Sequence, residues 1–303
     1  MISKYKYKNL TWIDLESPTK EEVLHIKEEY ELPPLVAEEL SIKTTRSKVD
    51  LYRNAIYLIL HFPTVSHKHG PSTEAEIDFV IGKDFLITTH YEFVDPLHDF
   101  SKVFEVNSIL DKSDMGEHAG YLFFYIMREL YKHTETELED INGTLMEIER
   151  NIFAGQESKM VQMISRTNRM LVDIRQATRF HKETLQSFDE ASKIFLGKDF
   201  SYHSASILGE YEKVKNTLDS HKEILNELRE TNDSLLSLKT TDTIKTLTIM
   251  SFVMMPLSLI AAIFSMDSNV IFIKDLHDFF SILAVMGMVV LLMLIYFRRK
   301  KWL

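Results

Sequence analysis

Two long apolar runs near the C-terminal end dominate the hydrophobic pattern of this chain. Residues 246–264 and 279–297 each carry no charged side chain across nineteen positions. At 1.5 Å per residue, each run gives a helix of about 28 Å, close to the ~30 Å thickness of the hydrocarbon core of a bilayer. We therefore predict two transmembrane helices, joined by an extracytoplasmic loop at 265–278.

The charges that flank these runs predict their orientation. The tail, 298–303, begins with Arg298, Arg299, Lys300 and Lys301, and such basic flanks remain on the cytoplasmic side of a membrane. Two spans return the chain to its starting side, so we expect both termini in the cytoplasm and the chain in the plasma membrane. A hairpin of two helices encloses no aqueous path, so conduction would require an oligomer.

The first part of the chain, 1–116, has the pattern of a cytoplasmic α/β domain. Residues 10–15 and 51–62 are rich in β-branched, aromatic and other apolar side chains, and they predict strands. Residues 76–81 and 85–90 alternate around a short polar turn, and they predict a β-hairpin.

A helix start follows the first predicted strand. Ser17 has a side chain that can act as an N-cap, and Pro18 suits the first helical position. Glu21 and Glu22 would then lie in the first turn, where a negative charge favours the helix.

Helical periodicity continues through the remaining polar part of the chain. Apolar residues recur near i, i+3, i+4 and i+7 over 121–153 and 159–188, which predicts long antiparallel helices for the region 117–202. A third run enters the first apolar span without a break, and a helix over 203–264 would be about 90 Å long. Residues 203–245 would form a stalk that leads into the membrane.

Small and hydroxyl-bearing residues form one row along this last helix at alternating steps of three and four. The row consists of Glu230, Ser234, Ser237, Thr241, Ile244, Thr248, Ser251, Met255, Ser258, Ala262 and Ser265. Such a row marks either tight helix packing, with each hydroxyl bonded to its own helix, or a face that lines water. In the second interpretation Ile244, Leu247 and Met255 would be apolar constrictions. Pro256 lacks an N–H and leaves a carbonyl free one turn earlier.

Composition removes several classes of function. The 303 residues include 35 basic and 45 acidic side chains, a formal charge of −10, and no cysteine. The acidic balance argues against a nucleic-acid partner, and the absence of cysteine excludes disulfides and thiolate metal sites. The sequence contains no nucleotide-binding, metalloprotease or nucleophile-elbow motif, so we predict no enzyme and no organic cofactor.

Several motifs resemble the CorA family of magnesium and cobalt transporters, which typically show K-x-L-T, P-L-T and then G-M-N. Residues 245–248 read KTLT and 256–258 read PLS, in the same order and spacing. The tail from Tyr296 onward and the segment from Trp12 to Glu22 are also similar to the family. The resemblance covers essentially the whole chain.

The resemblance implies a homopentameric channel with an α+β cytoplasmic domain, a long stalk helix and two transmembrane helices in each subunit. It places the pore face on Thr241, Ile244, Leu247, Met255 and Ser258, nearly the row found from periodicity, and it places Glu230 in a cytoplasmic funnel. It implies that Mg²⁺ is transported and that bound Mg²⁺ regulates opening.

This chain departs from the family pattern at two places. The signature G-M-N becomes Ser265, Met266 and Asp267, and five aspartates around one axis would form a strongly negative ring at the pore mouth. The stretch in which many members carry a regulatory carboxylate reads SAS at 204–206, and Glu210 and Glu212 are the nearest replacements. Regulation by Mg²⁺ is therefore a weaker expectation than conduction.

Three functions remain open at this point. The first is a passive channel for Mg²⁺, with Co²⁺ or Ni²⁺ as further ions. The second keeps the fold and changes the ion or the direction: Zn²⁺ transport of the ZntB type, or efflux. The third is a membrane-anchored scaffold or regulatory protein that does not conduct, which the altered loop motif motivates.

Overall fold

The computed structural model describes residues 1–64, 73–109, 118–265 and 276–300. They divide into two compact units, Met1–Arg229 and Glu230–Leu303. The first unit contains a six-stranded sheet with the strand order β1-β2-β6-β5-β4-β3. Its strands are β1 (Ile2–Tyr7), β2 (Leu10–Glu16), β3 (Lys48–Leu51), β4 (Ile56–Thr64), β5 (Thr73–Ile81) and β6 (Phe85–His90).

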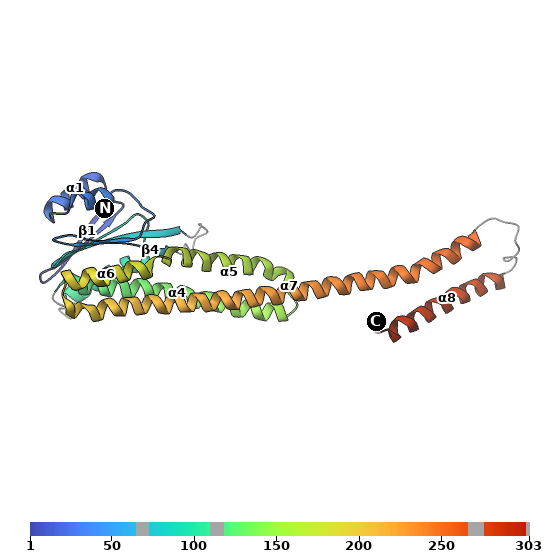
Figure 1. Ribbon diagram of the computed structural model, residues 1–303. Helices are drawn as coiled ribbons and strands as arrows, with labels where there is room; N and C mark the ends of the chain where they lie inside the picture. The colour runs from blue at the N-terminus through green and yellow to red at the C-terminus, as the bar shows by residue number, and fades with distance from the viewer. Residues whose placement is uncertain (65–72, 110–117, 266–275, 301–303) are drawn as a thin grey trace. The chain divides into compact units, whose positions relative to one another are not determined.

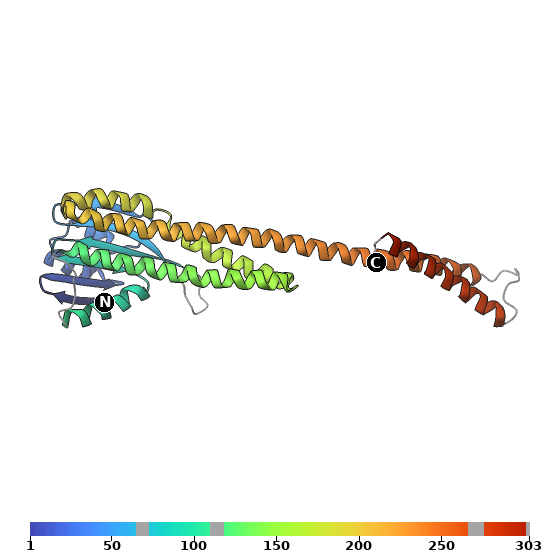
Figure 2. The same cartoon turned by 90° about the horizontal axis from the view of Figure 1, so that it is seen from below.

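Helices cover both faces of this sheet. On one face, α1 (Lys20–Glu29) and α2 (Pro34–Glu39) enclose a core of buried aliphatic side chains. The other face is covered by longer helices, among them α4 and α6, and α1 lies on the opposite side from them (Figure 1). These longer helices are α3 (Asp95–Ile109), α4 (Ala119–Phe153), α5 (Glu157–Thr178) and α6 (His181–Phe195). The α4–α5 hairpin extends beyond the end of the strands (Figure 2).

The last two helices contain the apolar runs. Helix α7 spans Ser201–Ser265 in 65 residues without interruption, after a short 3₁₀ turn at Lys198–Phe200. This continuity confirms the prediction of one helix over 203–264. Helix α8 spans Leu276–Arg299. The residues of the intervening loop, 266–275, lie outside the described part of the chain.

The strand predictions hold in part. The hairpin is confirmed as β5 and β6, and the strand at 10–15 is confirmed as β2. The single strand expected at 51–62 is wrong at its start, because Leu51 ends β3 and a turn separates it from β4. Strand β1 was not predicted. It lies at the edge of the sheet, and its sequence, ISKYKY, contains few aliphatic residues.

The start of α1 lies two residues later than predicted. Thr19 is the N-cap, and it forms a capping box in which its hydroxyl accepts from the backbone N–H of Glu22, while the Glu22 carboxylate accepts from the Thr19 N–H. Ser17 instead has a φ of 44°, and its hydroxyl donates to the Tyr91 carbonyl. Pro18 therefore precedes the cap.

The helix expected over 159–188 is divided into α5 and α6, and this prediction was wrong. The break places His181 at the start of α6 with no exposed surface. Its Nε2 lies 2.8 Å from the His61 carbonyl oxygen of β4, and its Nδ1 lies 2.7 Å from the Tyr131 hydroxyl of α4. Strand β3 pairs with β4 only from Ile56 to Ile59, so the histidine satisfies a carbonyl that β3 does not reach.

Candidate functional site

Two helices of the described chain are long and apolar enough to cross a bilayer, namely Lys198–Ile263, which lies mostly in α7, and Phe280–Arg299 in α8. No residue in the apolar window of the first helix is buried. Exposed apolar surface of this extent is unfavourable in water, so it must contact lipid or further protein. The candidate site is the row of hydroxyl-bearing residues on this part of α7.

The membrane part of α7 has one partly covered face. Most of its half-buried residues recur at steps of three and four: Lys245, Ile249, Val253, Pro256 and Ile260. A similar set on α8 is also partly or fully covered: Ile282, Met286, Val289, Met293 and Phe297. Both helices belong to the same compact unit.

The hydroxyl row lies on the other side of α7. Thr248 of the row is half-buried, whereas its membrane members Ser251, Met255, Ser258 and Ala262 are exposed. At about 100° per residue, the mean direction of these four lies roughly 150° from that of the covered face. The row is therefore turned away from the half-buried face of α7, and it is available to line a path or to contact further copies.

Hydrogen bonding within α7 determines whether the hydroxyls in this row can act as donors or as acceptors towards a ligand. Thr241, Thr248, Ser251 and Ser258 each donate to the carbonyl four residues earlier, over distances of 2.9, 2.7, 2.9 and 2.9 Å. The single proton of each hydroxyl is thereby used, while its oxygen keeps acceptor capacity. Water bound to a cation points its hydrogens outward, so a row of acceptors suits a hydrated cation. The packing interpretation and the water-lined interpretation of the row are thus compatible.

Large apolar side chains lie in the row, or beside it in the case of Leu247, where constrictions were expected. Ile244, Leu247 and Met255 are 59%, 65% and 74% exposed. Pro256 follows Met255 inside the helix, and the carbonyl of Phe252 therefore lacks the usual backbone N–H partner. In the described chain nothing covers these three side chains, so their closure of a path depends on neighbouring copies.

Several predicted residues lie at or beyond the edges of the described chain. Ser265 is the last residue of α7, whereas Met266 and Asp267 lie outside the described residues. Arg298 and Arg299 end α8 and Lys300 follows it, whereas Lys301 lies outside. Among the described residues, no group of three or more His, Cys, Asp or Glu side chains is arranged to hold a metal ion.

At the start of α7, the position at which many family members carry a regulatory carboxylate holds a serine that bonds within the chain. Ser204 is buried, and its hydroxyl donates to the Asp189 carboxylate and lies near the Ser201 carbonyl. Burial opposes ionisation of Asp189, but hydrogen bonds from Lys193 and Ser204 outweigh it and lower the pKa of this carboxyl.

The two replacement carboxylates already have cationic neighbours within the chain. An oxygen of Glu210 lies 3.9 Å from Nε of Arg128, and one of Glu212 lies 3.6 Å from Nζ of Lys182. A third contact joins Lys213 of α7 to Glu135 of α4 at 2.7 Å. Sequence reasoning missed these cations, because Arg128 and Lys182 are distant in the chain and helical phase alone does not show which helices meet.

Comparisons with known proteins agree with this arrangement. A family model described as CorA-like Mg²⁺ transporter protein matches residues 7–299. The cobalt/magnesium transport protein CorA of Thermotoga maritima is 23% identical over 297 residues, which cover 97% of this chain and 83% of that protein.

Solved structures show the same fold. The complete structure of the CorA magnesium transporter from Methanocaldococcus jannaschii superposes with a TM-score of 0.83 at 16% identity, over 99% of this chain and 93% of that one. The ZntB cytoplasmic domain from Vibrio parahaemolyticus superposes with a TM-score of 0.63 at 12% identity, over 76% of this chain and 89% of that one.

Proposed function

The chain belongs to the CorA family of divalent-cation transporters, whose model matches residues 7–299, and we propose that it conducts Mg²⁺ passively across the plasma membrane as a homopentamer. Co²⁺ and Ni²⁺ are the further ions that we propose. The observation that carries the proposal is the hydroxyl row of α7, which is exposed except at half-buried Thr248 and is turned away from the half-buried face of the helix. When copies assemble around an axis, these rows supply a path lined with hydrogen-bond acceptors.

The proposed path begins at the loop motif and ends in the cytoplasm. Asp267 of each subunit would collect cations at the mouth, because a ring of carboxylates attracts divalent ions and accepts hydrogen bonds from their bound water. The ion would then pass Ser258, Met255 and Ser251 and leave past Glu230. Basic residues at the end of α8 support cytoplasmic termini.

Regulation by bound Mg²⁺ receives less support from the structure. Glu210 and Glu212 each have a cation of the same chain within 4 Å, and a divalent ion would have to compete with it. We therefore propose Mg²⁺ first as the transported ion, and a regulatory role only where neighbouring copies bring additional carboxylates to the head of α7.

Zinc is the second candidate, because the soluble part of this chain also superposes on a ZntB cytoplasmic domain. The purified protein in liposomes, with an inside-negative potential, should admit Mg²⁺ faster than empty liposomes do. Transport of Zn²⁺ or Co²⁺ without Mg²⁺ would move the assignment to a sister transporter. If a correctly assembled oligomer transported none of the three ions, the non-conducting scaffold would be favoured.

The variant Asp267→Asn separates the role of the loop from that of the row. It restores the amide of the G-M-N signature, so we expect a changed rate or selectivity with conduction retained. Identical fluxes for the variant and the parent protein, with each ion, would show that Asp267 does not meet the ion.

A further inference from the structure

Two carboxyl groups lie in the apolar interior of the first unit. Glu76 and Asp78 of β5 are both 0% exposed. As alternate residues of one strand they share a face, and the same face carries Val80, which belongs to the core under α1 and α2. Two ionised carboxylates side by side in such a place would be strongly unfavourable.

Each carboxyl group receives one hydrogen bond from elsewhere in the unit. Glu76 Oε2 accepts from the backbone N–H of Thr44 at 2.6 Å, and Asp78 Oδ2 accepts from the Tyr57 hydroxyl at 3.0 Å. Glu76 Oε1 and Asp78 Oδ1 are buried and receive no hydrogen bond from any donor of the described chain. The charge of Glu76 also opposes ionisation of Asp78. Burial and the like charge of the neighbour both disfavour ionisation, so the pair is more stable with one proton bound than with none.

An independent feature of the neighbouring strand points to the same place. Thr89 of β6 lies directly opposite Asp78 in the sheet and is also 0% exposed. Its hydroxyl has no hydrogen-bond partner among the described residues. Beyond it, the Tyr91 hydroxyl and one oxygen of Glu92 are also buried without a partner. This end of the sheet therefore contains buried hydroxyl and carboxyl groups that the described residues leave without a hydrogen bond.

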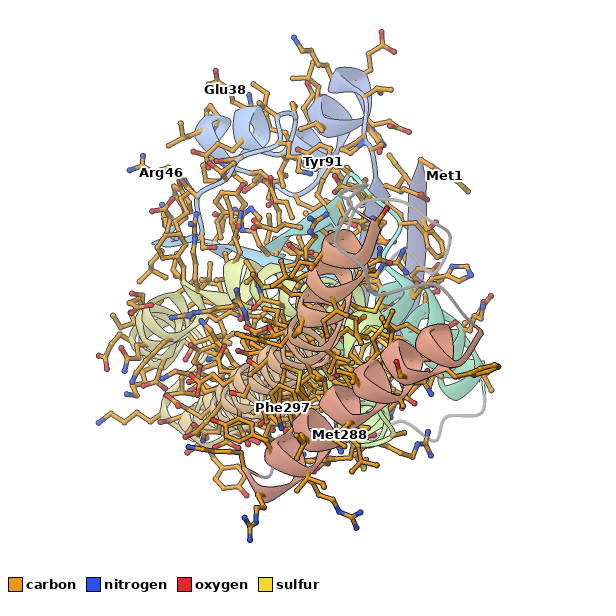
Figure 3. All side chains as sticks on the ribbon, turned by 90° about the vertical axis from the view of Figure 1, so that its right-hand side faces the viewer. Met1, Glu38, Arg46, Tyr91, Met288 and Phe297 are labelled. Atoms are coloured by element: carbon orange, nitrogen blue, oxygen red, sulfur yellow. The ribbon has the colours of Figure 1, made fainter. Side chains whose placement is uncertain are left out.

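The segment 43–47, between α2 and β3, is anchored on these groups. Besides the bond from Thr44 to Glu76, the His61 ring meets the Thr44 carbonyl at 2.9 Å and the Ser47 hydroxyl at 3.1 Å. Lys43 forms an ion pair with Glu92. Arg46 of this segment lies at the periphery, and Tyr91 lies farther inward (Figure 3).

We propose that Glu76 and Asp78 share one proton and that this proton locks segment 43–47 onto the sheet. While the proton is bound, the pair carries one negative charge, which Thr44 and Tyr57 stabilise by donation. When it leaves, two adjacent charges remain in a site where Glu76 Oε1 and Asp78 Oδ1 receive no hydrogen bond from the described residues. Water must then enter, and the segment that covers Glu76 is the part that can move aside.

Burial places this transition near neutral pH. Burial raises the pKa of Glu76 to about 7, although the Thr44 N–H and the Lys43 ammonium oppose the shift. Burial, followed by the charge of Glu76, raises the pKa of Asp78 well above its usual range. The other titratable groups that face the pair are Tyr57 and His61 of β4, Tyr91 and Glu92 after β6, and Glu39 of α2.

The sign of the effect follows from these raised pKa values. The folded chain binds more protons than the unfolded chain at every pH between the ordinary and the raised pKa. The lock is therefore complete in mild acid, and it weakens as pH rises through about 7. A proton is the occupant we infer rather than a metal, because the described residues hold no group of three metal-ligating side chains.

Hydrogen exchange of the full-length protein in detergent tests this lock without measuring ion flux. We expect the amides of 43–47 to lose at least about tenfold in protection, beyond the intrinsic rate change, between roughly pH 6 and pH 8.5. A protonated-carboxyl infrared band should disappear over the same range. The double variant Glu76→Gln, Asp78→Asn should keep its protection throughout, and exposed Glu38→Gln should behave as the parent protein does.

Three results would overturn the proposal. Protection of 43–47 that is independent of pH would show that no lock exists. An unchanged pH response in the double variant, or in Asp78→Asn alone if the double variant does not fold, would place the titrating group elsewhere. Recovery of protection at high pH on adding Mg²⁺ alone would identify a cation as the occupant. None of these results bears on whether the protein conducts.

Discussion

At the scale of single residues, Met255 combines two properties that we expect of a constriction. It belongs to the acceptor row and is 74% exposed in the chain, and its flanking row members are serines. We expect Met255→Gly to raise Mg²⁺ flux severalfold, because it removes a large apolar side chain from a narrow path that excludes water. Ion entry into liposomes at matched protein content measures this.

Met250→Gly is the matched control for that prediction. Met250 is 65% exposed and lies in the same span, but five residues place it about 140° around the helix from Met255. Both variants introduce the same helix-weakening glycine. An equal rise in flux from the two would show a loosened helix rather than an opened constriction.

The His181 side chain joins α4 to β4, and its titration should therefore affect the stability of the first unit. Burial lowers its pKa to about 4, and the neutral ring lies between the Tyr131 hydroxyl and the His61 carbonyl. Because the folded pKa is depressed, we expect stability to fall as pH drops from about 6.5 towards 4, by up to about 1.4 kcal/mol per pH unit.

Denaturant unfolding, followed by the fluorescence of buried Trp12, measures this dependence. The variant His181→Gln retains a donor and an acceptor but does not titrate, so its stability should change less over the same acidic range. A slope equal to that of the parent protein would assign the acid sensitivity to another group.

At the scale of elements, the start of α1 shows which details a sequence leaves open. Ser17 and Thr19 are both suitable N-caps by composition, and only the register of the capping box selects Thr19. We expect Thr19→Ala to reduce the free energy of unfolding by about 1 kcal/mol. Trp12 fluorescence in denaturant measures the loss.

Thr19→Ser keeps the hydroxyl and should remain close to the parent protein. Ser17→Gly should be neutral or stabilising, because glycine adopts the positive φ of 44° found at this position without strain. A larger loss for Ser17→Gly than for Thr19→Ala would reverse the assignment of the cap.

The predictability of each element depended on whether its cause is local. The single α7 helix and both apolar spans could be predicted, since unbroken periodicity and the absence of charge are properties of neighbouring residues. The break between α5 and α6 could not, because its cause is the bond from His181 to a carbonyl on a strand 120 residues away in sequence. The buried acid pair of β5 had a local signal, two acids at alternate positions of an apolar strand, but its shared proton depends on Thr44 and Tyr57.

The row along α7 could also be found from local sequence, but the side of the helix that is covered by other parts of the chain could not. Periodicity identified its members, whereas burial shows that Ile249, Val253 and Ile260 lie on a half-buried face from which the row is turned away. The row repeats every seven residues, so on a straight helix it drifts by about 20° per repeat. A path lined by the whole row therefore requires the assembled α7 helices to wrap in a left-handed sense.

At the scale of the whole molecule, a passive channel is driven only by the gradient and the membrane potential. A doubly charged ion gains about 4.6 kcal/mol per 100 mV, from roughly 2.3 kcal/mol for each charge. At about 60 mV, inside negative, Mg²⁺ should therefore accumulate until its inner activity is on the order of 100 times the outer activity. Dye-loaded liposomes with a potassium diffusion potential measure this ratio.

Reversing the diffusion potential distinguishes passive conduction from directed export. With the interior positive, the same liposomes should lose preloaded Mg²⁺ instead of gaining it, because the path through the α7 rows has no built-in direction. The apolar spans orient the protein in the bilayer, but they do not couple the ion to any second reaction. Movement that keeps one direction under both potentials would require an energy source beyond the gradient, and it would contradict the passive mechanism.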